Sequence, residues 1–327
     1  MRRLLLAAAP ILHLTRVSTA FAVVANVWFV ILWTRAAEQE AGTQALREQP
    51  LWLLLMGGAA TGLGLFAFGT SLNDILDVRR DRALRPSRPL AAGRMRVESA
   101  VSLVAGTLIL AILGATVFGT EGVMVTLSVA AAILLFNAAG KFIPGVGVVL
   151  LGAVYAGHMM APNVYLTFIW PVWLVLTQAL VVAGATHMIA RRIPPLSRRA
   201  VFFAIVGWAG CSAILVQRGR DLDAGLRALW PDWVNPMSGI GVGVLAMLLV
   251  VYSWRKVAVL GSGQRAADKV GRYSALWMSL YAFVWLLGQS LWIEASIIAG
   301  LATAGLIGMS IIREAYGLVE QPAGYRR

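Results

Sequence analysis

The chain consists mostly of apolar runs that are long enough to cross a lipid bilayer as helices. A helix needs about 20 apolar residues to span the hydrocarbon core, and these runs lack the polar alternation of transmembrane β-strands. With 59% apolar and 13% charged residues, the 327-residue chain is not a water-soluble globule. The sequence therefore predicts an all-α protein, a polytopic transmembrane bundle of about nine to ten helices that forms one integral membrane domain over residues 1–327. The expected spans are residues 10–34, 51–72, 99–118, 121–137, 145–161, 164–189, 200–217, 237–255, 274–292 and 295–312.

The charged segments between the runs predict the orientation of the bundle. Most of the 28 Lys and Arg side chains fall in alternate connecting segments, and segments rich in these residues face the cytoplasm. We therefore expect a bacterial-type inner-membrane protein with cytoplasmic N- and C-termini, a cytoplasmic loop over residues 73–97 and an outward interfacial loop over residues 218–236. If residues 274–312 formed a single kinked helix, the bundle would have nine spans and not ten. The basic residues are scattered and not gathered in one stripe, so the net charge of +13 does not indicate a nucleic-acid partner.

A cluster of oxygen-bearing side chains stands at the end of the second apolar run: Asn73, Asp74, Asp77 and Asp81. In a helix, Asn73, Asp77 and Asp81 repeat every four residues, so the spacing predicts that their oxygens converge on one face. Carboxylates held this close need a cation, and hard oxygen ligands suit Mg²⁺. The segment that follows is rich in arginine, whose guanidinium group matches phosphate geometry. The cluster is a candidate site for Mg²⁺ and a polyphosphate; the alternative is that the aspartates only neutralise the neighbouring arginines.

The pattern Asn-Asp-x-x-Asp-x-x-x-Asp at residues 73–81, followed by Arg-Pro-x-Arg-Pro-Leu-x-x-Gly at residues 85–93, resembles the first signature of the UbiA superfamily of intramembrane prenyltransferases. Arg16 and Lys141 are similar to two basic residues that these proteins carry. The resemblance implies transfer of an isoprenyl group from an isoprenyl diphosphate to a lipophilic, membrane-soluble acceptor, with Mg²⁺ as the cofactor. By position, it makes Asp74, Asp77 and Asp81 catalytic, makes these three and Asn73 the metal ligands, and makes Asn73, Arg16, Arg88 and Lys141 substrate-binding residues.

The chain departs from this family at its second acidic motif. Members carry that motif at the inner end of the sixth span, where residues 184–195 of this chain hold His187, Arg191 and Arg192 and no acid. Three interpretations stay open: one Mg²⁺ suffices and Arg191 or Arg192 bonds the diphosphate directly; the site binds a phosphorylated lipid without cleaving it; or the chain is a catalytically degenerate subunit of a membrane-protein complex. His187 is a further candidate for substrate binding, with capping of the helix end as its alternative. The subunit interpretation predicts lipid-facing tryptophans for contacts with partners: Trp277, Trp285 and Trp292.

Overall fold

The protein is a bundle of helices throughout the part of the chain that the computed structural model describes, residues 11–12, 14–15, 20–86, 88–222 and 230–320. No strand occurs among these residues, which confirms the all-α class. The long helices are α2 (Phe21–Ala36), α4 (Leu51–Leu76), α6 (Val97–Ala115), α7 (Gly119–Ala138), α8 (Pro144–Met160), α9 (Trp170–Ile189), α10 (Arg198–Leu222), α11 (Pro236–Leu260), α12 (Gln264–Gly288) and α13 (Trp292–Glu320). The short elements are α3 (Thr43–Arg47), α5 (Val78–Leu84) and the 3-10 turns η2 (Thr116–Phe118) and η3 (Gly140–Phe142).

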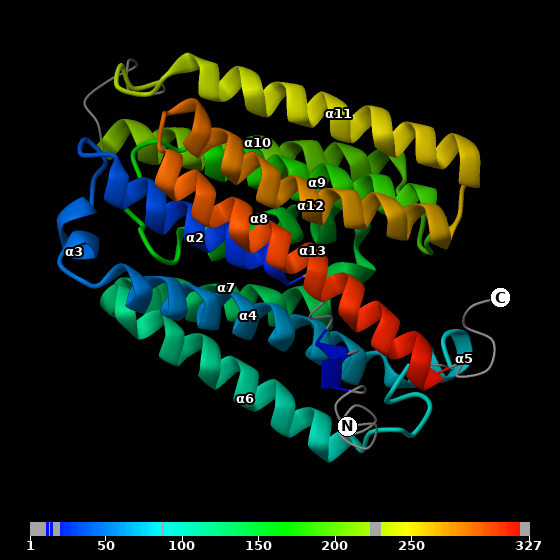
Figure 1. Ribbon diagram of the computed structural model, residues 1–327. Coiled ribbons are helices and arrows are strands. Elements are labelled where there is room, and N and C mark those ends of the chain that lie inside the picture. Colours follow the sequence, from blue (N-terminus) through cyan, green and yellow to red (C-terminus); the bar gives the residue numbers. More distant parts are fainter. Residues whose placement is uncertain (1–10, 13, 16–19, 87, 223–229, 321–327) are drawn as a thin grey trace.

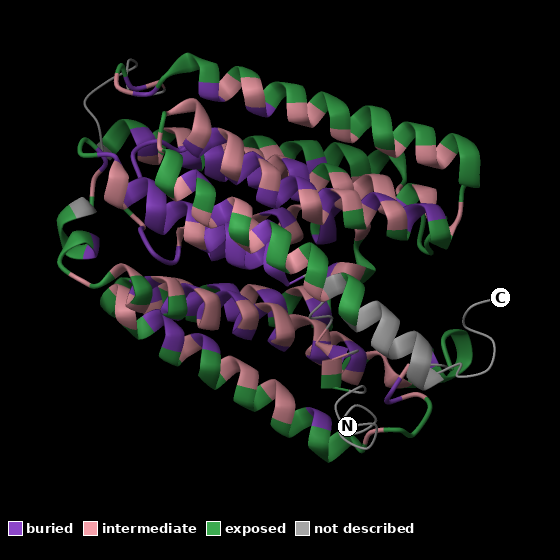
Figure 2. Ribbon diagram, in the orientation of Figure 1, coloured by how far each residue is buried: buried purple, intermediate pink, exposed green. Residues whose placement is uncertain are grey.

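The long helices lie side by side, and their connections gather at two ends of the bundle (Figure 1). At one end, α4 leads into α5, and Lys141 from the α7–α8 connection reaches Asp77. We call this the acid-cluster end. At the opposite end, the segment between α2 and α3 contacts the segment between α8 and α9 through Glu40 and Thr167. Most of α2 is buried among α4, α8, α12 and α13, so α2 is the central helix (Figure 2).

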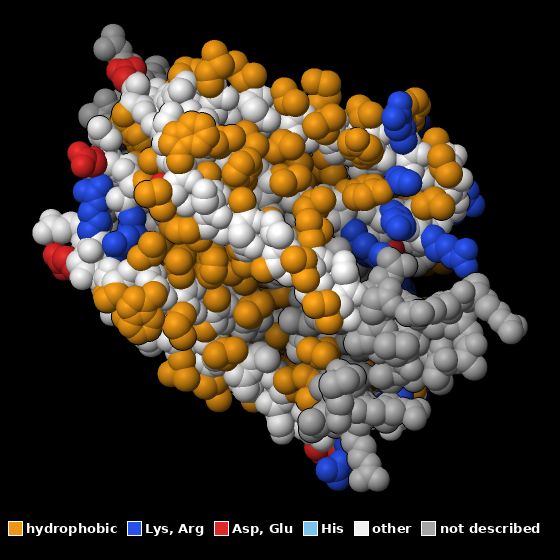
Figure 3. Space-filling view, in the orientation of Figure 1, with side chains coloured by type: hydrophobic (Ala, Val, Ile, Leu, Met, Phe, Trp, Pro, Cys, Tyr) orange, Lys and Arg blue, Asp and Glu red, His pale blue; other side chains and the backbone are white. Residues whose placement is uncertain are grey.

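The outer helices present apolar side chains to their surroundings. α6 and α11 are largely exposed (Figure 2), and their exposed side chains include Leu113, Val250 and Trp254. On the face that Figure 3 shows, apolar side chains lie along the length of the bundle, and Lys and Arg lie at its two ends, with more of them at the acid-cluster end. Such a surface is stable in a bilayer, so the chain is an integral membrane protein. Five helical segments of the described chain are long and apolar enough to cross a membrane: residues 51–76, 97–138, 170–189, 198–221 and 236–260.

Two connecting segments differ from their predicted form. Residues 73–97 are not one loop, because α4 continues to Leu76 and α5 occupies Val78–Leu84 before the chain turns into α6. Residues 218–222 belong to the end of α10 and not to an outward loop. In both places, helical hydrogen bonding continues beyond the apolar run into charged residues, because backbone pairing depends little on the side chain that each residue carries.

The last two long helices are separate, since α12 ends at Gly288 and α13 begins at Trp292. Residues 274–312 therefore do not form one kinked helix. The expectation that Trp277 and Trp285 face the lipid is wrong: they are 4% and 1% exposed, because α12 packs against α2 and α9 inside the bundle. Trp292 is 66% exposed. Large aromatic rings gain contact area in the interior, which explains the inward orientation of the first two.

α4 and α6 pack closely through small residues. These are Gly57, Thr61 and Gly64 in α4, and Thr107, Ala111 and Gly114 in α6. A Cβ atom on Gly64 would lie 2.7 Å from both the backbone N of Ala111 and the backbone O of Thr107. Lipid tails are as apolar as the helix faces, so the close approach that small residues allow is what holds such a pair of helices together.

We expect Gly64→Ala to destabilise the folded protein, because the added methyl group separates α4 from α6. Overpacking of this kind costs about 1–3 kcal/mol, which lowers the midpoint of thermal unfolding in detergent. Gly106→Ala is the matched control, since a Cβ atom at Gly106 of α6 meets nothing within 4 Å. Equal midpoints for the two variants would contradict this account of the packing.

Candidate functional site

The junction of α4 and α5 places four oxygen-bearing side chains at the acid-cluster end. The helix is interrupted only at Asp77, which has φ −92° and ψ 3°. Backbone bonding continues across the interruption: Asp77 N donates to Asn73 O at 3.0 Å, and Asp81 N donates to Asp77 O at 2.8 Å. The side chains of Asn73, Asp74, Asp77 and Asp81 consequently stay on adjoining faces of one nearly continuous helix.

Arg88 holds the first pair of carboxylates. Its Nη1 donates to Asp74 Oδ1 at 2.9 Å and to Asp81 Oδ2 at 2.6 Å. Asp74 and Asp81 are only 3% and 5% exposed, and the side chain of Arg88 is 14% exposed. At such burial an ion pair is little screened by water, and removing one partner leaves an unpaired charge that is costly to hold. Asp74 and Asp81 are thus neutralised by the same guanidinium group.

Lys141 holds the second pair of side chains. Its Nζ donates to Asn73 Oδ1 at 3.1 Å and to Asp77 Oδ1 at 2.9 Å. Lys141 lies in η3 directly after α7, and Asn137 ties α7 to α4 by donating to Gly69 O at 3.3 Å. Asn73 and Asp77 therefore share the ammonium group of Lys141, a residue that is remote from them in the sequence.

The segment that carries Arg88 is anchored to the bundle. Leu90 is buried and packs with Ala100 of α6 and with Leu14. Gly93 has φ +68°, a left-handed conformation that glycine adopts without steric penalty, and this turn directs the chain back toward α6. Arg88 is thereby held beside the end of α4, which explains why this arginine, of the several in the segment, bridges the two aspartates.

The four side chains lie close together as two linked pairs, because Asn73 Nδ2 donates to Asp74 Oδ1 at 3.3 Å. Nowhere in the described ranges do three acidic, His or Cys side chains form a group that could hold a metal ion. The donor set nevertheless suits Mg²⁺, which prefers carboxylate and amide oxygens. Arg88 Nη1 further shows that Asp74 and Asp81 reach a common cation. The chemistry of these side chains, and not a preformed group of ligands, is what suits Mg²⁺.

The remaining predicted residues lie at the same end or outside the described part of the chain. His187 is buried near the end of α9, and its Nε2 lies 2.8 Å from Pro194 O in the connection that follows the helix. Arg191 and Arg192 are exposed in the connection from α9 to α10. Figure 1 places that connection at the acid-cluster end. Arg16 lies outside the described residues.

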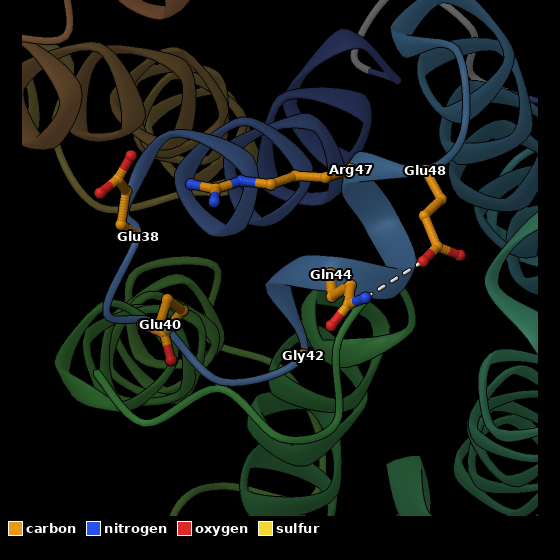
Figure 4. A pocket seen from close by; sticks show the side chains of 6 residues that line it. All are labelled: Glu38, Glu40, Gly42, Gln44, Arg47 and Glu48. Atoms are coloured by element: carbon orange, nitrogen blue, oxygen red, sulfur yellow. Dashed lines mark hydrogen bonds between the residues drawn. The ribbon is translucent and has the colours of Figure 1, made fainter.

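Sequence reasoning missed a buried carboxylate at the opposite end. Glu40 is 3% exposed, and it accepts hydrogen bonds from Trp33 Nε1 at 3.1 Å and from Thr167 N and Oγ1, both at 2.5 Å. It borders a pocket of about 590 Å³ beside α3 (Figure 4). Burial raises the pKa of the Glu40 carboxyl above its usual range, although these hydrogen bonds oppose the shift. In the sequence Glu40 resembles its neighbour Glu38, so no local signal marks it.

The raised pKa of Glu40 predicts that stability depends on pH. Because the folded-state pKa lies above the ordinary value of 4.5, the stabilising contribution is complete below pH 4.5 and is lost as the pH rises through the folded-state pKa. The unfolding free energy of the wild type relative to Glu40→Gln should fall in that window by up to about 1.4 kcal/mol per pH unit. Unfolding in detergent over a series of pH values measures this difference. A difference that stays constant with pH would show that Glu40 does not titrate as described.

Fold and site together define a polytopic helical membrane protein with a paired acid and base cluster at one end. No protein-family model and no curated protein matches its sequence. Among solved structures, one of digeranylgeranylglyceryl phosphate synthase aligns with 86% of this chain and 98% of its own length, with a TM-score of 0.51 and 18% identity. This likeness shows a UbiA-type fold, and it confirms the predicted resemblance at the level of the fold.

Two further structures are similar to this chain. A UbiA homologue from Aeropyrum pernix K1 aligns with 82% of the chain and 97% of its own length, with a TM-score of 0.48 and 18% identity. A UbiA homologue from Archaeoglobus fulgidus bound to GPP and Mg²⁺ aligns with 85% of the chain and 99% of its own length, with a TM-score of 0.41 and 15% identity.

Proposed function

We propose that this protein is a UbiA-type prenyltransferase, which moves an isoprenyl group from an isoprenyl diphosphate to a lipophilic acceptor with the help of Mg²⁺. The observation that carries the proposal is the double pairing at the end of α4, where two pairs of oxygen-bearing side chains each share a basic nitrogen. Carboxylates suit Mg²⁺, while Arg88 and Lys141 suit phosphate oxygens. The fold shared with digeranylgeranylglyceryl phosphate synthase supports the same assignment.

Each residue of the cluster has a role in this proposal. Asp74, Asp77, Asp81 and Asn73 hold the metal, and Arg88 and Lys141 hold the oxygens of the diphosphate. When bound, Mg²⁺ supplies Lewis-acid neutralisation of the charge that develops on the leaving group. Further candidates for contact with the substrate are Arg16, His187, Arg191 and Arg192.

The proposed transfer breaks the bond between C1 of the prenyl group and a diphosphate oxygen, and the electron pair leaves with the diphosphate. The nucleophilic atom of the acceptor forms the new bond to C1 and gives up its proton, which the departing diphosphate can take. An allylic centre that loses its leaving group reacts readily with water, so exclusion of water favours transfer over hydrolysis. Because residues 184–195 contain no acid, we propose a site with a single Mg²⁺ in which Arg191 or Arg192 contacts the diphosphate directly.

We further propose that the acid-cluster end faces the cytoplasm of a bacterial-type inner membrane, with both termini on that side. The support is the distribution of charge, since exposed basic side chains at this end include Arg79, Arg80, Arg255 and Arg265. Segments rich in Lys and Arg stay on the cytoplasmic side. In this orientation the water-soluble head of a prenyl diphosphate reaches the cluster from the cytoplasm, while its apolar tail lies in the membrane.

We expect Asp77→Asn and Asp81→Asn each to reduce prenyl transfer by at least about 100-fold, because each removes a charge on which the electrostatics of the site depend. The assay follows the loss of GPP and the appearance of prenylated product in vesicles of bacterial lipid extract with Mg²⁺, and chelation of Mg²⁺ should abolish the wild-type reaction. Glu98→Gln is the matched control, since Glu98 is an exposed acid in the first turn of α6.

Unchanged transfer in both aspartate variants would show that the assigned mechanism is wrong. The competing function, a catalytically degenerate subunit of a membrane complex, is favoured by two observations. Residues 184–195 contain no acid, and each of the three aspartates is neutralised by Arg88 or Lys141, as expected if the aspartates only balance nearby basic residues. This competing function predicts no transfer by the wild type and a particle larger than the monomer in mild detergent.

A further inference from the structure

The connection between α11 and α12 carries a group of basic side chains that the protein itself does not balance. Residues 233–293 contain one acid, Asp268, whose Oδ1 accepts a hydrogen bond from Gln264 Nε2 at 2.7 Å. Five bases lie around it, at the end of α11 and the beginning of α12: Arg255, Lys256, Arg265, Lys269 and Arg272. Within the part of the chain that the structure describes, none of these five makes a hydrogen bond or an ion pair. We call residues 255–272 the basic hairpin.

The bases of α12 share one face of the helix. Arg265, Lys269 and Arg272 are spaced four and three residues apart, so they lie one above another. Ala267 and Val270 point to the opposite side and are buried in the bundle. The three basic side chains therefore point away from the core, toward the surroundings of the protein.

α11 adds a fourth base beside them. α11 and α12 run antiparallel, and two close contacts set their register: Ser238 with Gly288, and Gly241 with Val284. Because both helices rise by the same distance per residue, this register places Lys256 level with Lys269. Both side chains are partly buried, so water screens their mutual repulsion less than it would at an open surface. An anion that contacts both ammonium groups would replace this repulsion with attraction.

The same hairpin has an apolar side. α11 packs chiefly against α12, and on its outer side Trp254 is 71% and Val259 is 80% exposed. A tryptophan at the membrane surface lies at the level of the lipid headgroups. Lys and Arg side chains gather in Figure 3 where Figure 1 places the connection from α11 to α12. Positive charges and an exposed apolar helix face thus adjoin, which matches a ligand with an anionic head and apolar chains.

We propose that the basic hairpin binds an anionic phospholipid. Lys256, Lys269 and Arg272 contact the phosphate group, and the acyl chains lie along α11 beside Trp254. Basic side chains between membrane helices recognise anionic headgroups, and each base near the membrane surface strengthens the binding of an anionic lipid by about fivefold. This inference does not rest on the proposed prenyl transfer, because the hairpin is separate from the acid cluster.

The test measures lipid binding to the full-length protein in neutral detergent. Native mass spectrometry with phosphatidylglycerol and phosphatidylcholine in equal amounts gives the apparent affinity for each lipid. We expect the wild type to bind phosphatidylglycerol at least about tenfold more tightly than phosphatidylcholine. The double variant of Lys269→Gln and Arg272→Gln should lose at least about tenfold in affinity for phosphatidylglycerol and keep its affinity for phosphatidylcholine.

The matched control removes the same amount of charge at another place. The double variant of Arg198→Gln and Arg199→Gln changes two exposed arginines at the start of α10, which packs against α8 and α9 and not against the basic hairpin. It should bind phosphatidylglycerol like the wild type. Equal losses in the two double variants would show that only the net charge matters, and the proposed site would then be wrong.

Two further results would overturn the inference. One is equal affinity of the wild type for the two lipids. The other is displacement of phosphatidylglycerol by an equal concentration of glycerol phosphate, because the site would then recognise a soluble phosphate and not a lipid. If the hairpin double variant fails to fold, Lys256→Gln repeats the comparison with one charge removed, and about a fivefold loss is expected. No readout involves turnover, so failure here leaves the proposed prenyl transfer unaffected.

Discussion

Charge pairing in a poorly solvated place governs the arrangement of the acid-cluster end. Asp74 and Asp81 are almost completely buried where α4 meets α5, and a buried carboxylate without a partner is unfavourable by several kcal/mol. Arg88 and Lys141 meet this requirement from two separate parts of the chain, so they also join the segment after α5 and the α7–α8 connection to α4.

The membrane environment explains the rest of the architecture. Because lipid surrounds the bundle, the outer faces of α6 and α11 carry apolar side chains. Inside the bundle, the helices are held by the close packing of their side chains and backbones. Small residues let the backbones of α4 and α6 approach each other, and the central α2 fills the space among its neighbours with side chains such as Phe29 and Trp33. Close packing of α4 matters for function as well, because the position of its end sets the position of the acids.

The two sides of the acid-cluster end differ in charge. α4 and α5 contribute three aspartates, whereas the end of α9 contributes His187, Arg191 and Arg192. His187 contacts Pro194 O, which is a contact within its own connection, and the two arginines are exposed. This difference in charge is the physical basis for proposing one Mg²⁺ and direct arginine contacts to the diphosphate.

The amino-acid sequence by itself determined the all-α class, the approximate positions of the long helices and the cluster from Asn73 to Asp81, because these follow from local composition and from the helical repeat. It also singled out Arg88 and Lys141, although only as members of a motif. The tertiary structure decided that Arg88 joins Asp74 to Asp81, that Lys141 pairs with Asp77 from 64 residues away, and that Trp277, Trp285 and Glu40 are buried. Each of these contacts depends on which faces of distant helices turn toward one another. The packing of the whole bundle and the cost of an unpaired charge inside it determine this arrangement. A local sequence pattern contains neither.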